Sequence, residues 1–247
     1  MNLEEFFKLN PKAAIAFSGG VDSAYLMYAA SHYAEDTTAY YVKSQFQPEF
    51  EFNDAVRLAD EIGVSLRVIN LNVLSDPQIL ANPADRCYYC KQVLFKAIIE
   101  AAAEDGFELI LDGTNASDEE GDRPGMRALR ELKVKSPLRE CALTKQEIRK
   151  LSREAGLFTW NKPSYACLAT RIPTGQEITK EKLEITEKAE AFLFSLGFKD
   201  FRVRMVEDRA KIQVGEDQLE MVFRLKDRIN SELKKYYSEV LLDLQCR

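Results

Sequence analysis

Histidine is almost absent from this 247-residue chain, which contains only His32. A single histidine excludes Ser–His catalysis and metal sites built from several histidines, and we expect this one at an exposed helix end. Long apolar runs are missing too, because none reaches the ~18 residues that a membrane span needs. The short acidic start Asn2–Lys8 does not resemble a signal peptide. We therefore expect a cytoplasmic protein with no membrane segment.

Positive charge is also in deficit, since 34 Lys and Arg residues face 40 Asp and Glu residues, for a net charge of −6. This balance makes nucleic acid an unfavourable partner, because general binding to nucleic acid or anionic membrane needs a cationic surface. A local basic pocket is still allowed. We find no internal repeat and no low-complexity segment, so the sequence gives no reason to expect a solenoid or a disordered tail. The composition favours one large domain and one small domain.

Residues 12 to 113 alternate short β-rich runs with helical patterns, which indicates a parallel sheet with helices on its faces. A further helix should follow Thr144, because its spacing to Glu147 matches a capping box. The predicted fold class is therefore a doubly wound α/β domain over residues 1–157. Its predicted strands and helices alternate as Ala13–Phe17, Ser23–Tyr33, Thr38–Val42, Phe52–Ile62, Leu66–Leu71, Cys90–Glu104 and Leu109–Leu111.

The pattern breaks over residues 158–175, where Trp, Asn, Pro and Gly predict an ordered active-site loop that links two domains. Residues 176–247 then predict a smaller α+β domain in the order helix, hairpin, helix, strand. Its predicted elements are Ile178–Leu196, Phe201–Val206, Lys211–Val214, Asp217–Tyr236 and Val240–Leu244.

The segment Ser18–Ser23, of sequence SGGVDS, lies between the first predicted strand and its helix. Gly19 and Gly20 let the backbone approach a ligand, and the N–H groups of a helix start favour an anion. Ser18 and Ser23 add hydroxyl donors. The loop lacks the lysine of a Walker motif, and the alternative is a merely tight turn. The pattern favours phosphate binding.

The segment resembles the SGGxDS signature of the PP-loop ATP pyrophosphatase superfamily. That resemblance implies that the loop holds the β,γ-pyrophosphate of ATP while a substrate oxygen attacks the α-phosphorus, giving an adenylylated intermediate. Asp22 and Ser23 would then be catalytic, with Asp22 orienting the loop or helping to hold Mg²⁺. Gly113 and Thr114 follow another parallel strand, at the edge where such sheets bind ligands, and are further nucleotide-binding candidates, with an ordinary turn as the alternative.

Two cysteines, Cys87 and Cys90, stand three residues apart near a helix start, where Arg86, Lys91 and the helix dipole favour thiolates. A third, Cys167, lies in the linking loop. Three thiolates suit a [4Fe–4S] cluster with one open iron better than a closed zinc site. A redox CxxC motif and buried structural cysteines are the alternatives. The remaining two cysteines lack this context and are expected to be structural, namely Cys141 and Cys246.

Nearly the whole chain resembles the LarE-type ATP-dependent sulfur transferases of nickel-pincer nucleotide biosynthesis. The resemblance implies that a carboxylate of pyridinium-3,5-biscarboxylic acid mononucleotide is adenylylated and then converted to a thiocarboxylate. Some members sacrifice one cysteine, here Cys167, which becomes dehydroalanine, whereas others hold a [4Fe–4S] cluster on three cysteines. Cys87 and Cys90 make this chain look like the second kind, with a separate sulfur donor. The segments that carry the resemblance are Ser18–Ser23, Asp112–Asn115, Gly121–Gly125, Pro163–Pro173 and Arg202–Arg204.

Substrate residues follow from the same resemblance. Arg171, Arg202 and Arg204 can bind the substrate phosphate bidentately, although exposed strand arginines are common. Glu190 matches an acidic position that the family places near the sulfur site, with a solvated helix residue as the alternative. Gln213 departs from the family pattern, because an acidic residue is expected there.

We also predict homo-oligomerisation through the small domain, from the family likeness and the two-layer pattern. A PP-loop tRNA thiolase is the nearest rival, and the acidic balance and lack of an RNA-binding appendage count against it. An amide-forming PP-loop synthetase would leave the three cysteines without a function. A non-enzymatic nucleotide-binding scaffold would bind ATP without releasing pyrophosphate.

Overall fold

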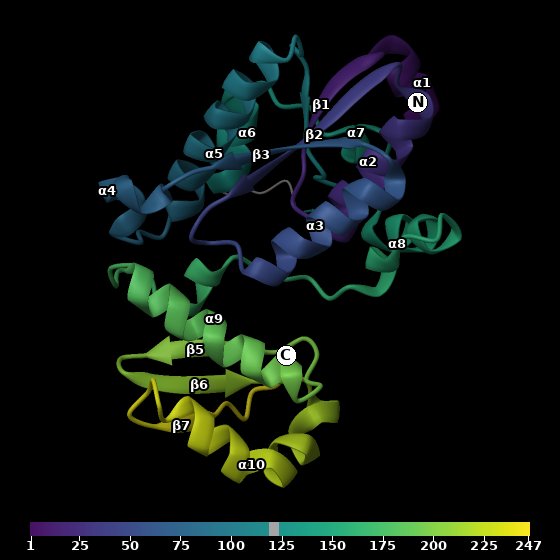
Figure 1. Cartoon of the computed structure of the whole chain (residues 1–247). Helices are drawn as coiled ribbons and strands as arrows, with labels where there is room; N and C mark the ends of the chain where they lie inside the picture. The colour runs from purple at the N-terminus through teal and green to yellow at the C-terminus, as the bar shows by residue number, and fades with distance from the viewer. Residues whose placement is uncertain (119–123) are drawn as a thin grey trace. The chain divides into compact units, whose positions relative to one another are not determined.

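The computed structural model describes residues 1–118 and 124–247 (Figure 1). The chain divides into two compact units, each described separately below. The first comprises Met1–Val73 and Asp85–Lys162, and the second comprises Leu74–Ala84 and Pro163–Arg247. Of the family-like turn Gly121–Gly125, residues 121–123 lie outside the described part of the chain.

The first unit contains a four-stranded parallel sheet with the strand order β3-β2-β1-β4. Ala14 of β1 is in register with Thr38 of β2 on one side and with Ile110 of β4 on the other. The chain reverses its winding direction at β1, because β2 and β3 follow on one side and β4 on the other. The strands are β1 (Lys12–Ala16), β2 (Asp36–Lys43), β3 (Ser65–Asn70) and β4 (Ile110–Leu111).

Helices cover both faces of this sheet, because neighbouring residues of β1 belong to different apolar clusters. Ala13 and Ile15 pack with residues of α1, α2, α3 and α8. Ala14 packs with Phe95 of α5 and Leu129 of α6. Alternation along a strand sends adjacent side chains to opposite faces. The doubly wound α/β prediction is thus confirmed, with helices α1 (Leu3–Leu9), α2 (Val21–Tyr33), α3 (Glu49–Ile62), α5 (Arg86–Glu104), α6 (Pro124–Glu131), α7 (Pro137–Glu140) and α8 (Lys145–Glu154), followed by the 3₁₀ turn η2 (Phe158–Asn161).

Local signals account for several helix ends. The capping box predicted at Thr144 is present, since its hydroxyl accepts from the N–H of Glu147 and the Glu147 carboxylate accepts from the N–H of Thr144. Asn2 makes an equivalent box at the start of α1, a short helix that the sequence patterns did not predict. His32 is exposed in the last turn of α2, as expected.

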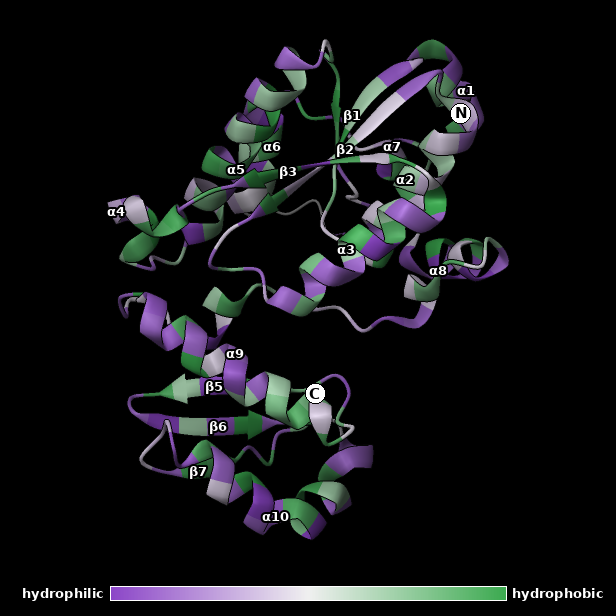
Figure 2. Cartoon of the chain, in the orientation of Figure 1, coloured by the Kyte–Doolittle hydropathy of each residue, from purple (hydrophilic) through white to green (hydrophobic). Residues whose placement is uncertain are grey.

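The second unit contains a three-stranded sheet with the order β5-β6-β7, in which β5 and β6 are antiparallel and β6 and β7 are parallel. The predicted order of helix, hairpin, helix and strand is confirmed. Figure 2 shows alternating hydrophobic and hydrophilic bands along α9 and α10, as expected for helices with one packed face. The elements are η1 (Val73–Ser75), which straddles the unit boundary, α4 (Pro77–Leu80), η3 (Leu168–Arg171), α9 (Lys180–Ser195), β5 (Arg202–Val206), β6 (Arg209–Gln213), η4 (Glu216–Gln218), α10 (Leu219–Leu233) and β7 (Val240–Leu242).

The small unit has its own apolar core, formed by Leu193 of α9, Val203 of β5, Ile212 of β6 and Ile229 of α10. All four side chains are buried. Among the described residues, no helix combines the length and apolar character that crossing a membrane requires.

Candidate functional site

The phosphate-binding candidate is the turn Ser18–Ser23 that joins β1 to α2. Gly19 adopts a left-handed φ of 73°, and a Cβ there would lie 3.3 Å from the Glu51 carbonyl oxygen. The Ser18 and Ser23 hydroxyls lie 3.0 Å apart and share a hydrogen bond, and Ser23 also donates to the Gly20 carbonyl. The turn is therefore closed by its own hydroxyls, and the N–H groups at a helix start such as that of α2 favour an anion.

The loop after β4 packs directly against this turn. A Cβ on Gly113 would lie 2.8 Å from the backbone nitrogen of Ser23, so only glycine permits the approach. The Asp112 carboxylate accepts hydrogen bonds from the hydroxyls of Thr114 and Ser136, which orders the loop. Because β1 and β4 are neighbours, the two predicted nucleotide-binding segments meet at the position where open α/β sheets bind ligands.

Asp22 points into a partly buried environment at the start of α2. Its Oδ2 lies 2.5 Å from the Lys145 ammonium, whereas Oδ1 is buried and has no hydrogen-bond partner among residues 1–118 and 124–247. Burial raises the pKa of the Asp22 carboxyl, and the hydrogen bond from Lys145 opposes that rise. A buried acceptor oxygen without a partner suits the proposed role of Asp22 in orienting the loop or holding Mg²⁺.

Cys87 lies in the first turn of α5 and Cys90 at the start of its second turn, because the helix begins at Arg86 rather than at the predicted Cys90. Cys87 is exposed and Cys90 is half-buried. Lys91 extends over Gly125, where a Cβ would lie 3.2 Å from the lysine Cδ and Cε atoms, and burial lowers the pKa of this lysine. The pair is thus located near a helix start, whereas its thiolate character stays a prediction.

Cys167, in the second unit, immediately precedes η3 and is half-buried. Arginine side chains hold the carbonyl groups around it. Arg171 donates to the Ala166 carbonyl at 2.7 Å, Arg204 to the Thr170 carbonyl at 2.9 Å, and Arg202 to the Ser164 carbonyl at 2.6 Å. We call residues 163–171 the cysteine loop. The arginines predicted to bind substrate thus also fix the backbone that carries the thiol.

Glu190 joins this network from α9, and it is buried, so the solvated alternative is wrong. Its carboxylate forms a bidentate pair with Arg171, at 2.8 Å to Nε and 2.9 Å to Nη2, and accepts from the Val203 N–H. The Tyr165 hydroxyl also donates to it, and the guanidinium groups of Arg171 and Arg202 lie 4.5 and 5.1 Å from the centre of the Tyr165 ring. Every guanidinium nitrogen of Arg171 therefore has a protein partner.

The surroundings of Arg202 and Arg204 change the pKa of both guanidinium groups. Burial lowers the pKa of Arg202 to about 10, and burial also lowers the pKa of Arg204. Arg202 is buried, so the alternative of a surface charge is wrong for that residue. Gln213 accepts from Arg204 Nε at 3.4 Å. A neutral amide here leaves the Arg204 charge less neutralised than the expected acidic residue would, which suits a phosphate ligand.

The [4Fe–4S] site predicted on Cys87, Cys90 and Cys167 has less support than the predicted phosphate-binding turn. Among the residues that the structure describes, no three or more His, Cys, Asp or Glu side chains are grouped to hold a metal ion. Cys87 and Cys90 belong to the first unit and Cys167 to the second. Within each unit, the described residues display no cluster site, and no chemical step below depends on one.

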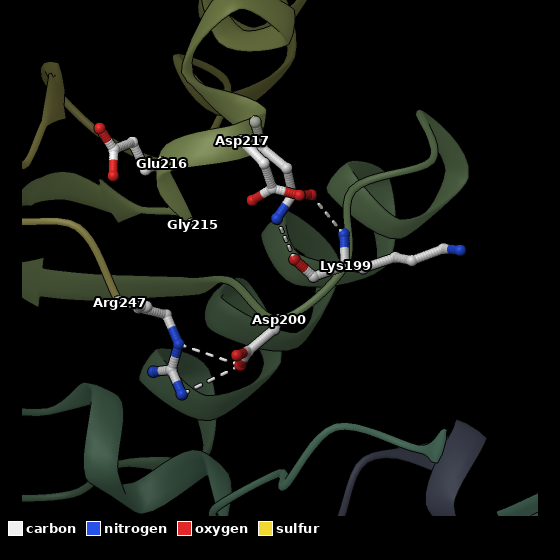
Figure 3. A pocket seen from close by; sticks show the side chains of 7 residues that line it. Lys199, Asp200, Gly215, Glu216, Asp217 and Arg247 are labelled. Carbon is white, nitrogen blue, oxygen red and sulfur yellow. Dashed lines mark hydrogen bonds and ion pairs between the residues drawn. The ribbon is translucent and has the colours of Figure 1, made fainter.

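A separate pocket of about 710 Å³ lies in the second unit (Figure 3). Arg247 forms an ion pair with Asp200 at 3.0 Å inside it. None of the predicted site residues lines this pocket, so we assign it no part in the reaction. Its lining residues are Lys199, Asp200, Gly215, Glu216, Asp217, Gln218 and Arg247.

No protein-family model matches the chain. The chain is 37% identical over 223 residues to an uncharacterized protein of Synechocystis sp.. The alignment covers 89% of this chain and 82% of that protein. The chain is 34% identical over 236 residues to the pyridinium-3,5-bisthiocarboxylic acid mononucleotide synthase of Lactiplantibacillus plantarum, covering 94% and 86% of the two chains. A tRNA-specific 2-thiouridylase of Pseudothermotoga lettingae is 27% identical over 206 residues, covering 67% of this chain and 58% of that protein.

Proposed function

This chain belongs to the LarE-type family of pyridinium-3,5-bisthiocarboxylic acid mononucleotide synthases, and we propose that it is an ATP-dependent sulfurtransferase of nickel-pincer nucleotide biosynthesis. It adenylylates a carboxylate of pyridinium-3,5-biscarboxylic acid mononucleotide and converts it to a thiocarboxylate. The observation that carries this proposal is the closed turn Ser18–Ser23 packed against Gly113, at the ligand-binding edge of the sheet.

In the first half-reaction, a carboxylate oxygen of the substrate attacks the α-phosphorus of ATP. The bond between the α-phosphorus and its bridging oxygen to the β-phosphate breaks, and the electron pair leaves with pyrophosphate. The backbone N–H groups and hydroxyls of Ser18–Ser23 stabilise the charge that develops on this leaving group. The acceptor oxygens of Asp22 hold the loop or Mg²⁺ in place.

In the second half-reaction, sulfur attacks the activated carbonyl carbon and AMP leaves with the electron pair of the broken C–O bond. Cys167 is the thiol that we place at this step, because arginines hold the carbonyls on both sides of it. Arg202 and Arg204 provide positive charge for the substrate phosphate. Arg171 and Glu190, which are paired with each other, keep the cysteine loop in one conformation.

The source of the transferred sulfur divides this proposal into two routes. In the sacrificial route, attack by Cys167 gives a thioester with the substrate. A base then removes the Cα proton of Cys167, and the Cβ–Sγ bond breaks with its electron pair leaving on the thiocarboxylate. Residue 167 becomes dehydroalanine, and the chain is lighter by about 34 Da, the mass of one H₂S. The three-cysteine [4Fe–4S] hypothesis stays a prediction, together with a separate sulfur donor. Anaerobic reconstitution tests it, since Ser variants of Cys87, Cys90 or Cys167 should each remove the iron–sulfur absorption band. An iron-free protein that completes one turnover and carries dehydroalanine would contradict it.

Two lines of evidence disfavour a tRNA thiolase. The tRNA-specific 2-thiouridylase is a more distant relative, and the net charge of −6 does not favour RNA. The decisive measurement is pyrophosphate release in the presence of ATP and one acceptor at a time, namely the pyridinium biscarboxylic acid mononucleotide, bulk tRNA or ammonia. We expect release with the mononucleotide alone. Release that needs tRNA or ammonia would overturn the proposed substrate.

The homo-oligomer and the domain limits 1–157, 158–175 and 176–247 also stay predictions. Light scattering at micromolar concentration tests the first, and a monomer would contradict it. Limited proteolysis tests the second, because an exposed linker is the preferred place for cleavage.

A further inference from the structure

The turn Ser18–Ser23, called the pyrophosphate turn from here on, has no positively charged side chain of its own. Its one ionisable residue is Asp22, an acid, and the turn lacks the lysine that Walker loops use against phosphate. A leaving pyrophosphate carries several negative charges, and backbone N–H groups supply only partial positive charge. Any protein cation that adds to the charge of Mg²⁺ here must therefore come from side chains outside the turn.

Lys145 brings one cation to the C-terminal side of the turn. Its ammonium lies 2.5 Å from Asp22 Oδ2, although the two residues are 123 positions apart in the sequence. Lys145 is the first residue of α8, and its backbone N–H donates to Ser117 in the segment that follows β4. The lysine is thus anchored to both segments that form the nucleotide-binding edge.

Lys162 brings a second cation to the N-terminal side of the turn. Its ammonium donates to the Gly19 carbonyl at 3.3 Å and pairs with Asp54 of α3 at 2.7 Å. Its side chain is only 14% exposed, so the charge is held against the turn rather than dispersed in solvent. A lysine bonded to a carbonyl inside the phosphate-binding turn lies within reach of a ligand bound there.

Helix α8 couples the two lysines. Arg149 lies one turn after Lys145 and donates to the carbonyls of Trp160 and Lys162, at 2.7 and 2.9 Å. One helix therefore carries the first lysine and fixes the backbone of the second. The Arg149 hydrogen bonds also hold η2 against α8, which is a purely structural role. That role does not require the ammonium groups of Lys145 and Lys162 to converge on one anion-binding turn.

We propose that Lys145 and Lys162 bind the β- and γ-phosphates of ATP and stabilise the departing pyrophosphate, replacing the lysine that the turn lacks. The proposal rests on the adenylylating function above. As substrate carboxylate attacks the α-phosphorus, negative charge grows on the oxygen that bridged the α- and β-phosphorus atoms. The lysines exchange part of their pairing with Asp22 and Asp54 for phosphate oxygens, so no proton is transferred and no further reactant is needed.

Binding of inorganic pyrophosphate with Mg²⁺, measured by calorimetry, tests the proposal without requiring the reaction. Lys145→Met and Lys162→Met keep the apolar stem and remove the charge. We expect each to weaken binding by about 10- to 100-fold, as for the loss of a charge-assisted hydrogen bond. Lys150→Met is the matched control, because Lys150 is an exposed residue of the same helix as Lys145 and pairs with Glu154 at 4.0 Å. It should leave binding unchanged.

Asp54→Asn keeps the test informative if either methionine variant unfolds. Removing this carboxylate frees the Lys162 ammonium, so pyrophosphate should bind several-fold more tightly. Thermal unfolding of every variant identifies loss of fold. Unchanged pyrophosphate affinity in the folded methionine variants, or weaker binding in Asp54→Asn, would overturn the proposal.

The acceptor assay separates this inference from the proposed function. If another acceptor triggers pyrophosphate release and the lysine variants still bind pyrophosphate weakly, the substrate assignment fails and the lysine assignment stands. If the mononucleotide triggers release and the folded lysine variants bind pyrophosphate normally, the substrate assignment stands and the lysine assignment fails.

Discussion

The pyrophosphate turn and the cysteine loop are built in different ways. Backbone geometry forms the first, since Gly19 and Gly113 allow close approach and two serine hydroxyls close the turn. Side chains form the second, since three arginines hold its carbonyl groups and Glu190 holds one of the arginines.

This difference predicts which kind of substitution should disturb each site. A backbone-built anion site depends on steric room and on a few hydroxyls, so small substitutions that add bulk should disturb it. A site fixed by buried charges depends on complete pairing, because a buried charge without its partner is costly. The predictions below separate these two sensitivities.

The largest effect is expected in the cysteine loop. Cys167→Ser removes the soft nucleophile and should lower thiocarboxylate formation by at least about 1,000-fold, while adenylylation and pyrophosphate release persist. Mass spectrometry of the product and a pyrophosphate assay measure the two steps. Cys141→Ser is the control and should retain both. Loss of both activities together in Cys167→Ser would show that the two regions are not chemically separate.

The next effect is expected in the pyrophosphate turn. Asp22→Ala or Ser23→Ala should lower acceptor-dependent pyrophosphate release by about 100- to 1,000-fold, because each removes a polar group that acts on phosphate or on its metal. Thermal unfolding should change little. Ser31→Ala, in the last turn of the same helix, should be neutral. Near-normal turnover in the Asp22 and Ser23 variants would argue against adenylylation.

Breaking the buried pair should affect stability. Glu190→Gln leaves Arg171 buried beside a neutral amide, and we expect the free energy of unfolding to fall by about 3–5 kcal/mol. Denaturant unfolding measures this change. Glu184→Gln, at an exposed position of the same helix, should cost less than about 1 kcal/mol. Equal losses in the two variants would mean that the pair does not hold the cysteine loop.

The smallest effect is expected from steric crowding at Gly113. Gly113→Ala places a Cβ 2.8 Å from the Ser23 nitrogen and should force the two segments apart, lowering stability by about 1–3 kcal/mol and weakening ATP binding. Gly20→Ala adds a Cβ whose nearest neighbour is 3.5 Å away, so its unfolding free energy should change less. Unfolding curves of both variants make the comparison. A stable Gly113→Ala protein with normal ATP affinity would mean that the close approach is not needed.

The sequence predicted the α/β class because hydrophobic periodicity and turn residues act locally. The strand before Ser18 and the capping box at Thr144 each depend on residues within a few positions, and both are present. Short helix α1 escaped prediction, since its seven residues pack through Phe6 and Phe7 rather than through a long periodic pattern.

The amino-acid sequence by itself determined the alternation of strands and helices, the glycines and hydroxyls of the pyrophosphate turn, and the position of the thiols. Only the tertiary structure decided that Glu190 is buried against Arg171, and that Lys145 and Lys162 approach a turn more than 120 positions away. The physical reason is the separation along the chain between the residues that interact. Backbone conformation follows from neighbouring residues, whereas the partner of a charge is set by packing between distant segments, which leaves no periodic or local trace in the sequence.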